Sequence, residues 1–356
     1  MNIHRMDKFE IEAEPAKSKK KGRKLFWLLL LVPLLMLCGY LLWTSPLFGR
    51  QLPEFSGQQI ANFTPLPAVT TSPDAKATEL PKPDKGPQDQ TADVTDKVTP
   101  VCGQTEPMVI LAIGIDENEQ ADMIRVLRVD FVEREVVILS IPRDFWVPIP
   151  GLEEHGITQF KINAAYGFGE YFNGRGQGVV KFSETMYENY GVTFDRYAVA
   201  HFSNFVDFID QIGGVDIDLA EPIGAYASAG HHHYDGKSAL QFVRLRIADQ
   251  DSYRIQRQSA ILKGIYDKLT QPENLIKLPG MGIKFIQDKT IITDLRLQDV
   301  STFTCFAREI NRDSLIFVDV PSDFYTPGIT NYGRYIRIPK PEATDFIRGI
   351  ILNGLE

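Results

Sequence analysis

The chain has 356 residues and a formal net charge of −8, and 44% of its residues are apolar. That apolar fraction excludes wholesale disorder, and three cysteines are too few for a disulfide-rich miniprotein or a zinc module built on CxxC pairs. The acidic balance argues against a general nucleic-acid binder, so we expect no nucleic-acid partner.

An uncharged segment follows a basic N-terminal tail. Residues 1–24 carry a net positive charge, concentrated in Lys17–Lys24, and the nineteen residues Leu25–Trp43 contain no charge. At about 1.5 Å per residue, such a helix spans roughly 28 Å, close to the thickness of a bilayer core. The positive-inside rule then predicts a single-pass cell-membrane protein with a cytoplasmic N-terminus and an extracytoplasmic C-terminal domain.

Two other interpretations of this segment were weighed. A cleaved signal peptide is disfavoured because the apolar run is long and no A-x-A site follows it. A lipoprotein attached at Cys38 is disfavoured because Leu37 stands where a small residue is expected.

Residues 44–107 have the composition of a linker. They hold ten of the chain's 22 prolines and little apolar periodicity, which indicates a disordered or polyproline-rich stalk outside the membrane. A spacer for an enzyme working above its membrane and a tether without further function fit this pattern equally well.

From Met108 the pattern becomes that of a folded domain, which we place at 108–356 with a motif-bearing core at 108–272. Apolar runs and alternation predict strands at Met108–Gly114, Val126–Val132, Val136–Ile141, Thr193–His201, Val215–Leu219 and Leu315–Val320. Helical spacing predicts helices at Val179–Tyr190, Ser203–Ile212, Gly236–Arg244, Ser252–Leu269, 297–310 and 341–353. Strands interleaved with helices predict a three-layer α/β/α sandwich around a mixed sheet.

Two cysteines lie outside the membrane in this topology. Cys102 and Cys305 could form a disulfide between the start of the domain and a late helix, or remain separate thiols.

Arginines are densest in Arg244–Gln258, which reads RLRIADQDSYRIQRQ. If a helix begins near Asp251, then Asp251, Arg254 and Gln258 share one face. Clustered guanidinium groups need an anion or carboxylates to neutralise them, and their planar forks match phosphate oxygens. A solvated helix with surface salt bridges is the alternative interpretation.

Further charged residues follow predicted strands. Arg143 comes just after the strand ending at Ile141, Asp116 follows the first strand, and Asp122 lies six residues later. Carboxylates at neighbouring strand ends could bind Mg²⁺, which prefers oxygen ligands shared with substrate phosphates, or could be ordinary loop acids.

Two conspicuous stretches are discounted. His231–His233 lies in what we interpret as a Gly/Ala-rich loop, where three adjacent side chains could not all face one metal ion. Gly167–Gly178 is glycine-rich but lacks a Walker lysine or a GxGxxG following a strand, so we interpret it as a mobile loop.

The ordered motifs together resemble the LytR-CpsA-Psr family of envelope proteins over residues 105–272. The residues that carry the resemblance are Ile113–Asp116, Asp122 before Val126–Asp130, Leu139–Asp144, Lys161–Ala164 with Tyr166, Ile212–Asp216, Asp235-Gly236, Ala239-Leu240, Phe242–Arg246, and Asp251 through Arg254 to Gln258.

This resemblance implies a phosphotransferase that moves a glycopolymer from a polyprenyl-diphosphate carrier onto a cell-wall acceptor such as peptidoglycan. It implies an α/β/α fold with an apolar cleft for the polyprenyl chain and a possible pyrophosphatase side activity. Diphosphate-binding residues would be Arg143, Arg244, Arg246, Arg254, Arg257 and Gln258. Catalytic residues would be Asp116, Asp122, Asp251, Arg143 and Arg254, with Mg²⁺ held by Asp116 and Asp122.

One position departs from the family pattern. The family places an arginine two residues before its second acid, and here that position is Gln120. Because of this departure, a second function remains an alternative: an envelope protein that binds polyprenyl (di)phosphate with little or no turnover. A transcriptional regulator is disfavoured, since an acidic domain outside the membrane cannot reach DNA.

Overall fold

The computed structural model describes residues 36, 39–41, 43–44, 52, 100–224, 227–245, 251–287 and 291–355. Side chains are not described at 251, 252, 278, 285 and 286. The chain divides into two compact units, Met1–Ser45 and Pro46–Glu356. Most of the predicted membrane segment Leu25–Trp43 and the whole basic tail lie outside the described residues. Among those described, no helix is both long and apolar enough to cross a membrane.

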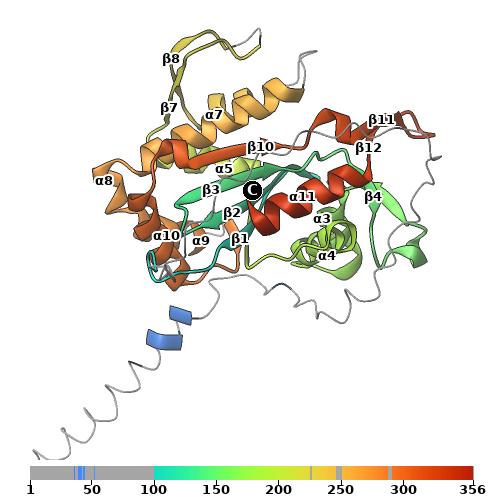
Figure 1. Cartoon of the computed structure of the whole chain (residues 1–356), viewed down its shortest axis with the longest axis horizontal. Helices are drawn as coiled ribbons and strands as arrows, with labels where there is room; N and C mark the ends of the chain where they lie inside the picture. The colour runs from blue at the N-terminus through green and yellow to red at the C-terminus, as the bar shows by residue number, and fades with distance from the viewer. Residues whose placement is uncertain are drawn as a thin grey trace, which may run out of the picture. The chain divides into compact units, whose positions relative to one another are not determined.

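A mixed sheet forms the centre of the second unit (Figure 1). Within the described residues it has six strands, in the order β10-β3-β2-β1-β6-β9. Neighbours pair in antiparallel fashion except for β10 with β3 and β1 with β6, which are parallel. The strands are β1 (Met108–Ile115), β2 (Ala121–Asp130), β3 (Glu135–Ser140), β6 (Arg196–His201), β9 (Ile291–Thr293) and β10 (Leu315–Asp319).

Three two-stranded ribbons accompany this sheet. β4 pairs with β5, β7 with β8, and β11 with β12, each in antiparallel fashion. Figure 1 shows the β7–β8 ribbon beside α7 and the β11–β12 ribbon near β4. Their bounds are β4 (Trp146–Pro148), β5 (Gln159–Lys161), β7 (Val215–Leu219), β8 (Gly230–Tyr234), β11 (Tyr325–Ile329) and β12 (Tyr335–Pro339).

Helices connect the strands. The described ones are α3 (Ala164–Phe168), α4 (Gly178–Tyr190), α5 (Phe202–Gln211), α6 (Gly236–Arg244), α7 (Asp251–Leu269), α8 (Pro272–Leu275), α9 (Leu278–Gln287), α10 (Leu297–Glu309) and α11 (Pro341–Asn353). Short single turns are η1 (Glu153–His155), the π-helical η2 (Gly169–Asn173), η3 (Arg312–Ser314) and η4 (Ser322–Phe324).

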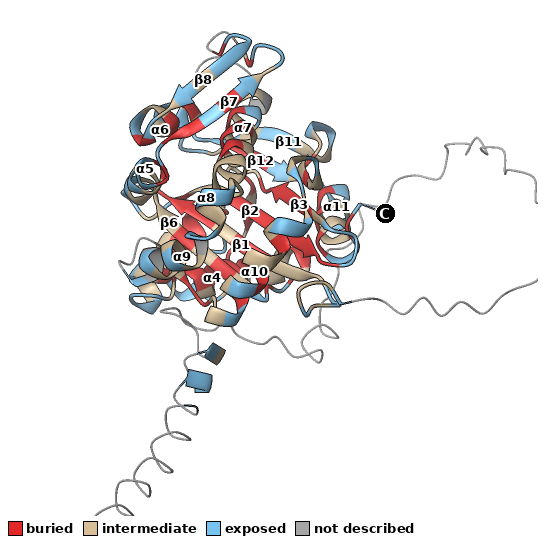
Figure 2. Cartoon of the chain, turned by 90° about the vertical axis from the view of Figure 1, so that its left-hand side faces the viewer, coloured by how far each residue is buried: buried red, intermediate tan, exposed pale blue. Residues whose placement is uncertain are grey.

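Side chains alternate between the two faces of the sheet, and each face has its own core. Figure 2 shows much of the central sheet in the colour of buried residues. Leu111 and Ile113 of β1 join α4 and α11 residues such as Phe182 and Ile347 in one cluster. Ile110, from the same strand, instead joins a cluster that contains Phe306 of α10. This alternation is what a period of two requires, and it confirms the predicted α/β fold with a central mixed sheet.

Three local predictions were wrong. The segment Gly167–Gly178 is not a loop throughout, because α3 runs into the π-helical turn η2, whose Gly169 packs against the backbone of Gln177 and Gly178. His231–His233 lies in strand β8, so its side chains alternate across the β7–β8 ribbon. β2 begins at Ala121, so Asp122 lies inside the strand and does not precede it.

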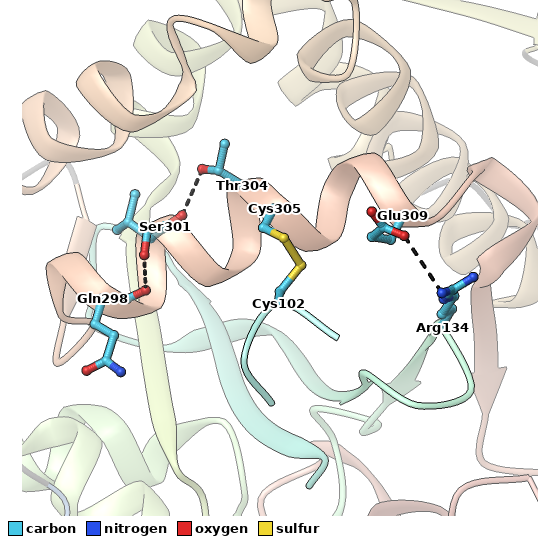
Figure 3. The surroundings of a disulfide bond; sticks show 8 residues. Cys102, Arg134, Gln298, Ser301, Thr304, Cys305 and Glu309 are labelled. Carbon is cyan, nitrogen blue, oxygen red and sulfur yellow. Dashed lines mark hydrogen bonds and ion pairs between the residues drawn. A yellow bond between two sulfur atoms is a disulfide. The ribbon is translucent and has the colours of Figure 1, made fainter. Parts of the chain in front are cut away.

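A disulfide joins Cys102 to Cys305, the second of which lies on α10 (Figure 3). The two Cα atoms are 5.8 Å apart and the cysteines are separated by 203 residues along the sequence. Backbone bridging between Val101 and Gln104 surrounds Cys102, on the N-terminal side of the predicted domain boundary at Met108. Closing so long a loop restricts the unfolded chain, which is how a disulfide stabilises a fold.

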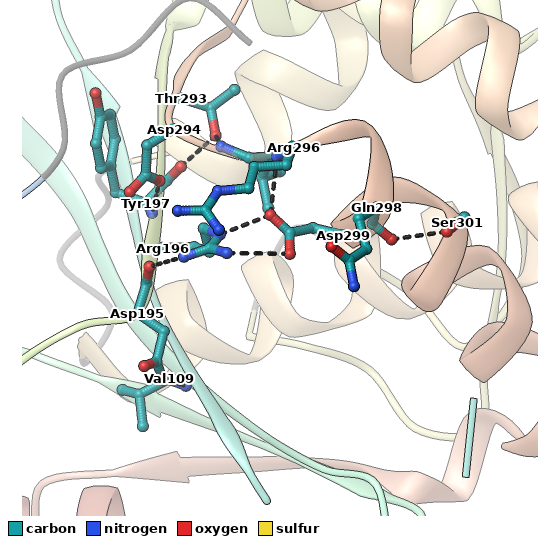
Figure 4. Close-up of polar contacts among 11 residues, drawn as sticks. Val109, Asp195, Arg196, Tyr197, Thr293, Asp294, Arg296, Gln298, Asp299 and Ser301 are labelled. Atoms are coloured by element: carbon teal, nitrogen blue, oxygen red, sulfur yellow. Dashed lines mark hydrogen bonds and ion pairs between the residues drawn. The ribbon is translucent and has the colours of Figure 1, made fainter. Parts of the chain in front are cut away.

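A polar network fixes the edge strand β9 and the helix α10 to β6 (Figure 4). Arg196 donates to both carboxylate oxygens of Asp299, at 2.6 and 3.2 Å. The backbone N–H of Tyr197 donates to Asp294 at 2.8 Å, and burial raises the pKa of that carboxyl to about 6. Because the charged form of Asp294 is disfavoured in the folded protein, this group lowers stability as pH rises from about 4 to 6.

We predict that Asp294→Asn stabilises the fold at pH 7 by roughly 1–2 kcal/mol, because each pKa unit corresponds to about 1.4 kcal/mol and asparagine keeps the acceptor for Tyr197. Urea unfolding at pH 4 and pH 7 measures the effect, and the gain should vanish at pH 4. Asp313→Asn, on an exposed turn, is the matched control. A destabilised variant at pH 7 would show that the charge of Asp294 is needed in the fold.

Candidate active site

The turn after β1 is built around Asp116. Its Oδ1 accepts hydrogen bonds from the backbone N–H groups of Asn118 and Gln120, both at 2.9 Å. Just before it, Gly114 carries no side chain where a Cβ would lie 3.0 Å from the ring of Phe202 and 3.2 Å from Met123. A larger residue at 114 would therefore push Phe202 out of place. The turn thus fixes the carboxylate of Asp116 just after β1.

Asp122 forms an ion pair with Arg143, which lies in the segment after β3. Both side chains are largely buried, at 12% and 15% exposure. Arg143 also lies 3.7 Å from Asp144, whose other carboxylate oxygen accepts from Lys161 at 2.7 Å. Backbone bonds from Asn163 to Arg143 and from Ala121 to Asn163 hold the same segments together. The result is a rigid charged cluster at one end of β2.

An apolar cleft of about 720 Å³ opens on one side of this cluster. Its wall comes mainly from β1, β6, α5, α6 and α7, and it includes Met123, Phe202, Phe205, Leu240, Val243, Ile261 and Leu262. Polar groups are few and include Asp122, Arg244, Arg254 and Gln258. An apolar trough with a few charged groups suits an amphiphile with a long apolar tail and an anionic head.

A polar pocket lies beside Asp122 and takes in Asp116 as well. Its wall consists of Asp116, Gln120, Asp122, Arg143, Asp144, Phe160, Lys161, Asn163, Ala164 and Arg334. Gln120 accepts a hydrogen bond from the Asn163 side chain at 3.2 Å. The position therefore contributes a neutral amide, fixed in place, to this pocket.

A third cavity, the arginine chamber, adjoins the other two and is open to solvent. Its wall includes Asp122, Met123, Arg125, Ser140, Arg143, Arg254, Gln258, Asp319, Tyr325 and Arg337. Asp122 lines all three cavities, so they meet at this residue.

Arg125 is a site residue that was not predicted. This side chain is only 2% exposed, and it donates to the hydroxyl of Ser140 and, at 2.9 Å, to Gln258. Burial lowers its pKa to about 10; Asp319 opposes that shift and Arg254 adds to it. The available signal was an arginine inside the apolar run MIRVL of a strand buried on both faces.

Arg337 and Arg334 were also missed, because the C-terminal segment carries no recognisable motif. Arg337 of β12 lines the arginine chamber, and Arg334, in the turn before β12, lines the polar pocket. Nothing in the sequence alone indicates that a ribbon some two hundred residues after Asp122 returns to it.

The structure gathers some of the predicted diphosphate ligands and separates others. Arg254 and Gln258 lie on α7 and line both the apolar cleft and the arginine chamber. Arg244, at the end of α6, lines the cleft and lies 5.0 Å above the ring of Phe202. Arg257 is fully buried and donates to the carbonyl of Leu245 at 2.8 Å, so it supports the end of α6. Its role as a phosphate ligand stays a prediction.

Two predicted residues cannot be placed in the site. Arg246 lies outside the described residues, and of Asp251 only the backbone, at the start of α7, is described.

The acids fit a divalent cation only in part. Asp116 and Asp122 both line the polar pocket, but among described residues no group of three or more acidic, histidine or cysteine side chains could hold a metal ion. Mg²⁺ commonly uses one or two carboxylates and completes its octahedron with water and substrate phosphates. The donor set therefore suits Mg²⁺ bound together with a phosphorylated substrate.

Similar proteins were found by sequence. The regulatory protein MsrR of Staphylococcus aureus is 29% identical over 184 residues, covering 49% of this chain and 52% of MsrR. The polyisoprenyl-teichoic acid–peptidoglycan teichoic acid transferase TagV of Bacillus subtilis is 28% identical over 212 residues, covering 54% of this chain and 51% of TagV. The chain thus spans about half the length of these curated relatives.

Solved structures share the fold. The crystal structure of Bacillus subtilis TagV superposes with a TM-score of 0.57 at 22% identity, over 71% of this chain and 98% of that one. That of Bacillus subtilis TagT gives 0.54 at 22% identity, over 70% and 91%. The sequence model of the LytR_cpsA_psr family matches residues 74–346, well over half of the chain. The predicted resemblance is confirmed, and the chain belongs to the LytR-CpsA-Psr family.

Proposed function

We propose that this protein transfers a glycopolymer from a polyprenyl-diphosphate carrier to a hydroxyl of a cell-wall acceptor such as peptidoglycan. The observation that carries the proposal is the junction at Asp122, where an apolar cleft for a lipid tail meets clustered arginines for a diphosphate. Two relatives are named as teichoic acid transferases acting on peptidoglycan, which supports the same class of reaction.

The proposed reaction breaks the bond between the two phosphates of the carrier. The acceptor hydroxyl attacks the phosphorus that bears the polymer, a phosphodiester forms, and polyprenyl phosphate leaves with the electron pair of the broken bond. A loose transition state places charge on the phosphoryl oxygens, so fixed guanidinium groups on Arg143 and Arg254 stabilise it. Water in place of the acceptor would give the pyrophosphatase side activity.

Each residue has a distinct part in this scheme. Arg244 and Arg254 border the apolar cleft, where they would bind the phosphate next to the lipid. Arg143 is held by Asp122 and Asp144, so its guanidinium is oriented before substrate arrives. Asp116 and Asp122 would hold Mg²⁺, which when bound supplies charge neutralisation to the diphosphate. Asp251 remains a candidate for the general base, the carboxylate that accepts the proton of the attacking hydroxyl.

Gln120 favours a second candidate function. With a neutral amide where the family has an arginine, the protein would bind polyprenyl (di)phosphate in the envelope with weak hydrolysis or none. Transfer of polymer to an acceptor distinguishes the two, because both functions require binding and only the transferase places polymer on the acceptor.

We further propose that Leu25–Trp43 anchors the chain in the cell membrane, with the N-terminus in the cytoplasm and the domain outside. The disulfide gives the test, because disulfides persist outside the reducing cytoplasm. In intact cells treated with a membrane-permeant thiol reagent before lysis, Cys102 and Cys305 should resist alkylation until a reductant is added. Full alkylation of both without reductant would contradict this placement.

The arginine clamp predicts a graded loss of activity. Arg143→Ala and Arg254→Ala each remove a charge-assisted contact worth roughly 1.5–3 kcal/mol, so transfer should fall about ten- to hundredfold. Lysine at either position should recover only part, because the bidentate geometry is lost. Transfer of polymer from a soluble prenyl-diphosphate analogue measures this. Arg312→Ala, an exposed arginine paired with Asp267, is the control. Full activity in both alanine variants would contradict the clamp.

The metal site predicts a steep dependence on Mg²⁺, since Gln120 contributes no positive charge. EDTA should abolish turnover, and Asp122→Ala and Asp116→Ala should raise the Mg²⁺ concentration needed for half-maximal rate. Gln120→Arg should lower that requirement by supplying a fixed charge. A Mg²⁺ titration of turnover, with circular dichroism to check folding, makes the comparison. A rate indifferent to EDTA would rule out the metal role.

A further inference from the structure

The arginine chamber lies across a shared wall from the apolar cleft. Asp122, Met123, Arg254 and Gln258 line both cavities. Among the described residues Arg244 lines the cleft and not the chamber, and Arg125 and Arg337 line the chamber and not the cleft. A lipid tail in the cleft therefore places its head group at the shared wall, and the chamber extends beyond it.

The chamber holds an excess of positive charge. Arg125, Arg143, Arg254 and Arg337 face it, against the carboxylates of Asp122 and Asp319. Arg125 and Arg254 are close enough to disfavour each other's charge, and so are Arg143 and Arg337. Like charges crowded in a half-buried space are stabilised by an anion that bridges them.

The Arg337 side chain is fixed by burial and by contact with two aromatic rings. It is 8% exposed, and its guanidinium lies 4.9 Å from the ring of Tyr325 and 5.9 Å from that of Tyr335. Its backbone N–H donates to the carbonyl of Asp144 at 2.9 Å, which ties β12 to the segment that carries Arg143. Contact with two aromatic rings limits the rotamers of a guanidinium before a ligand arrives.

We propose that the arginine chamber is a second anion subsite, formed by Arg125 and Arg337, which binds a phosphate group of the transferred polymer. The inference rests on the proposed function, since it assigns the chamber to the water-soluble part of that same donor. A phosphate fits better than a carboxylate, because its several oxygens can take forks from more than one guanidinium at once. The subsite would hold the polymer in register while its carrier phosphate reacts at the shared wall.

Competition on the wild-type protein tests for a separate site. Calorimetric titration with inorganic phosphate is carried out with and without a saturating short-chain prenyl-diphosphate analogue. Phosphate should bind in both cases, because the analogue leaves the far part of the chamber open. Loss of all phosphate binding on saturation, or no phosphate binding at all, would overturn the proposal. Failure of the analogue itself to bind or turn over would count against the proposed function instead.

Variants then locate the subsite. Arg337→Gln should weaken phosphate binding at least tenfold and prenyl-diphosphate binding by a smaller factor, and Arg337→Lys should restore part of the loss. Arg312→Gln is the matched control and should change neither. Equal weakening of both ligands by Arg337→Gln would make Arg337 part of the diphosphate site and overturn the proposal. Should Arg337→Gln fail to fold, the wild-type competition still decides.

Two soluble competitors identify the source of the anion. A short phosphodiester oligomer should displace inorganic phosphate from the analogue-saturated protein. A peptidoglycan peptide bearing free carboxylates should not. Displacement by the peptide alone would assign the chamber to the acceptor and overturn the assignment to the polymer.

Discussion

The ion pair between Asp122 and Arg143 is the contact on which the site depends. Asp122 belongs to β2 at the centre of the sheet, and Arg143 belongs to the segment that leaves β3. Because both side chains are largely buried, removing either would weaken the neutralisation of the other at the place where the three cavities meet. The ion pair fixes the orientation of the Arg143 guanidinium. A bound diphosphate must therefore share this guanidinium with the carboxylate of Asp122.

The surrounding elements explain why the cluster can be so rich in arginine. Asp144 lies between Arg143 and Lys161, Asp319 lies opposite Arg125, and the ring of Phe202 lies beneath Arg244. Each cation thus has a partial counterpart within the fold, which keeps the protein stable without substrate. The partial balance leaves enough positive potential to attract a multiply charged anion, which is the condition a phosphoryl-transfer site must meet.

Much of the fold could be predicted because its strands and helices have unambiguous periodicity. The strand Glu135–Ser140 and the helix Gly178–Tyr190 fall within a residue or two of prediction. Prediction failed where local composition misleads: His231–His233 forms a strand through pairing with β7, a partner that no local pattern reveals. The acids and Arg254 were found by spacing, whereas Arg125 and Arg337 were missed, since their roles arise from contacts across more than a hundred residues.

Gln120 and three arginines that were not predicted, Arg125, Arg334 and Arg337, bear on one question, which is how this chain supplies charge to its substrate. In the polar pocket Gln120 is a neutral amide bonded to Asn163, and the carboxylates of Asp116, Asp122 and Asp144 are matched by the cations of Arg143, Lys161 and Arg334. The arginine chamber instead has four arginines against the carboxylates of Asp122 and Asp319. Positive potential is therefore greater in the chamber, on the side of Tyr325 and Arg337 of the β11–β12 ribbon. An anionic donor that binds at Asp122 would be drawn toward that ribbon.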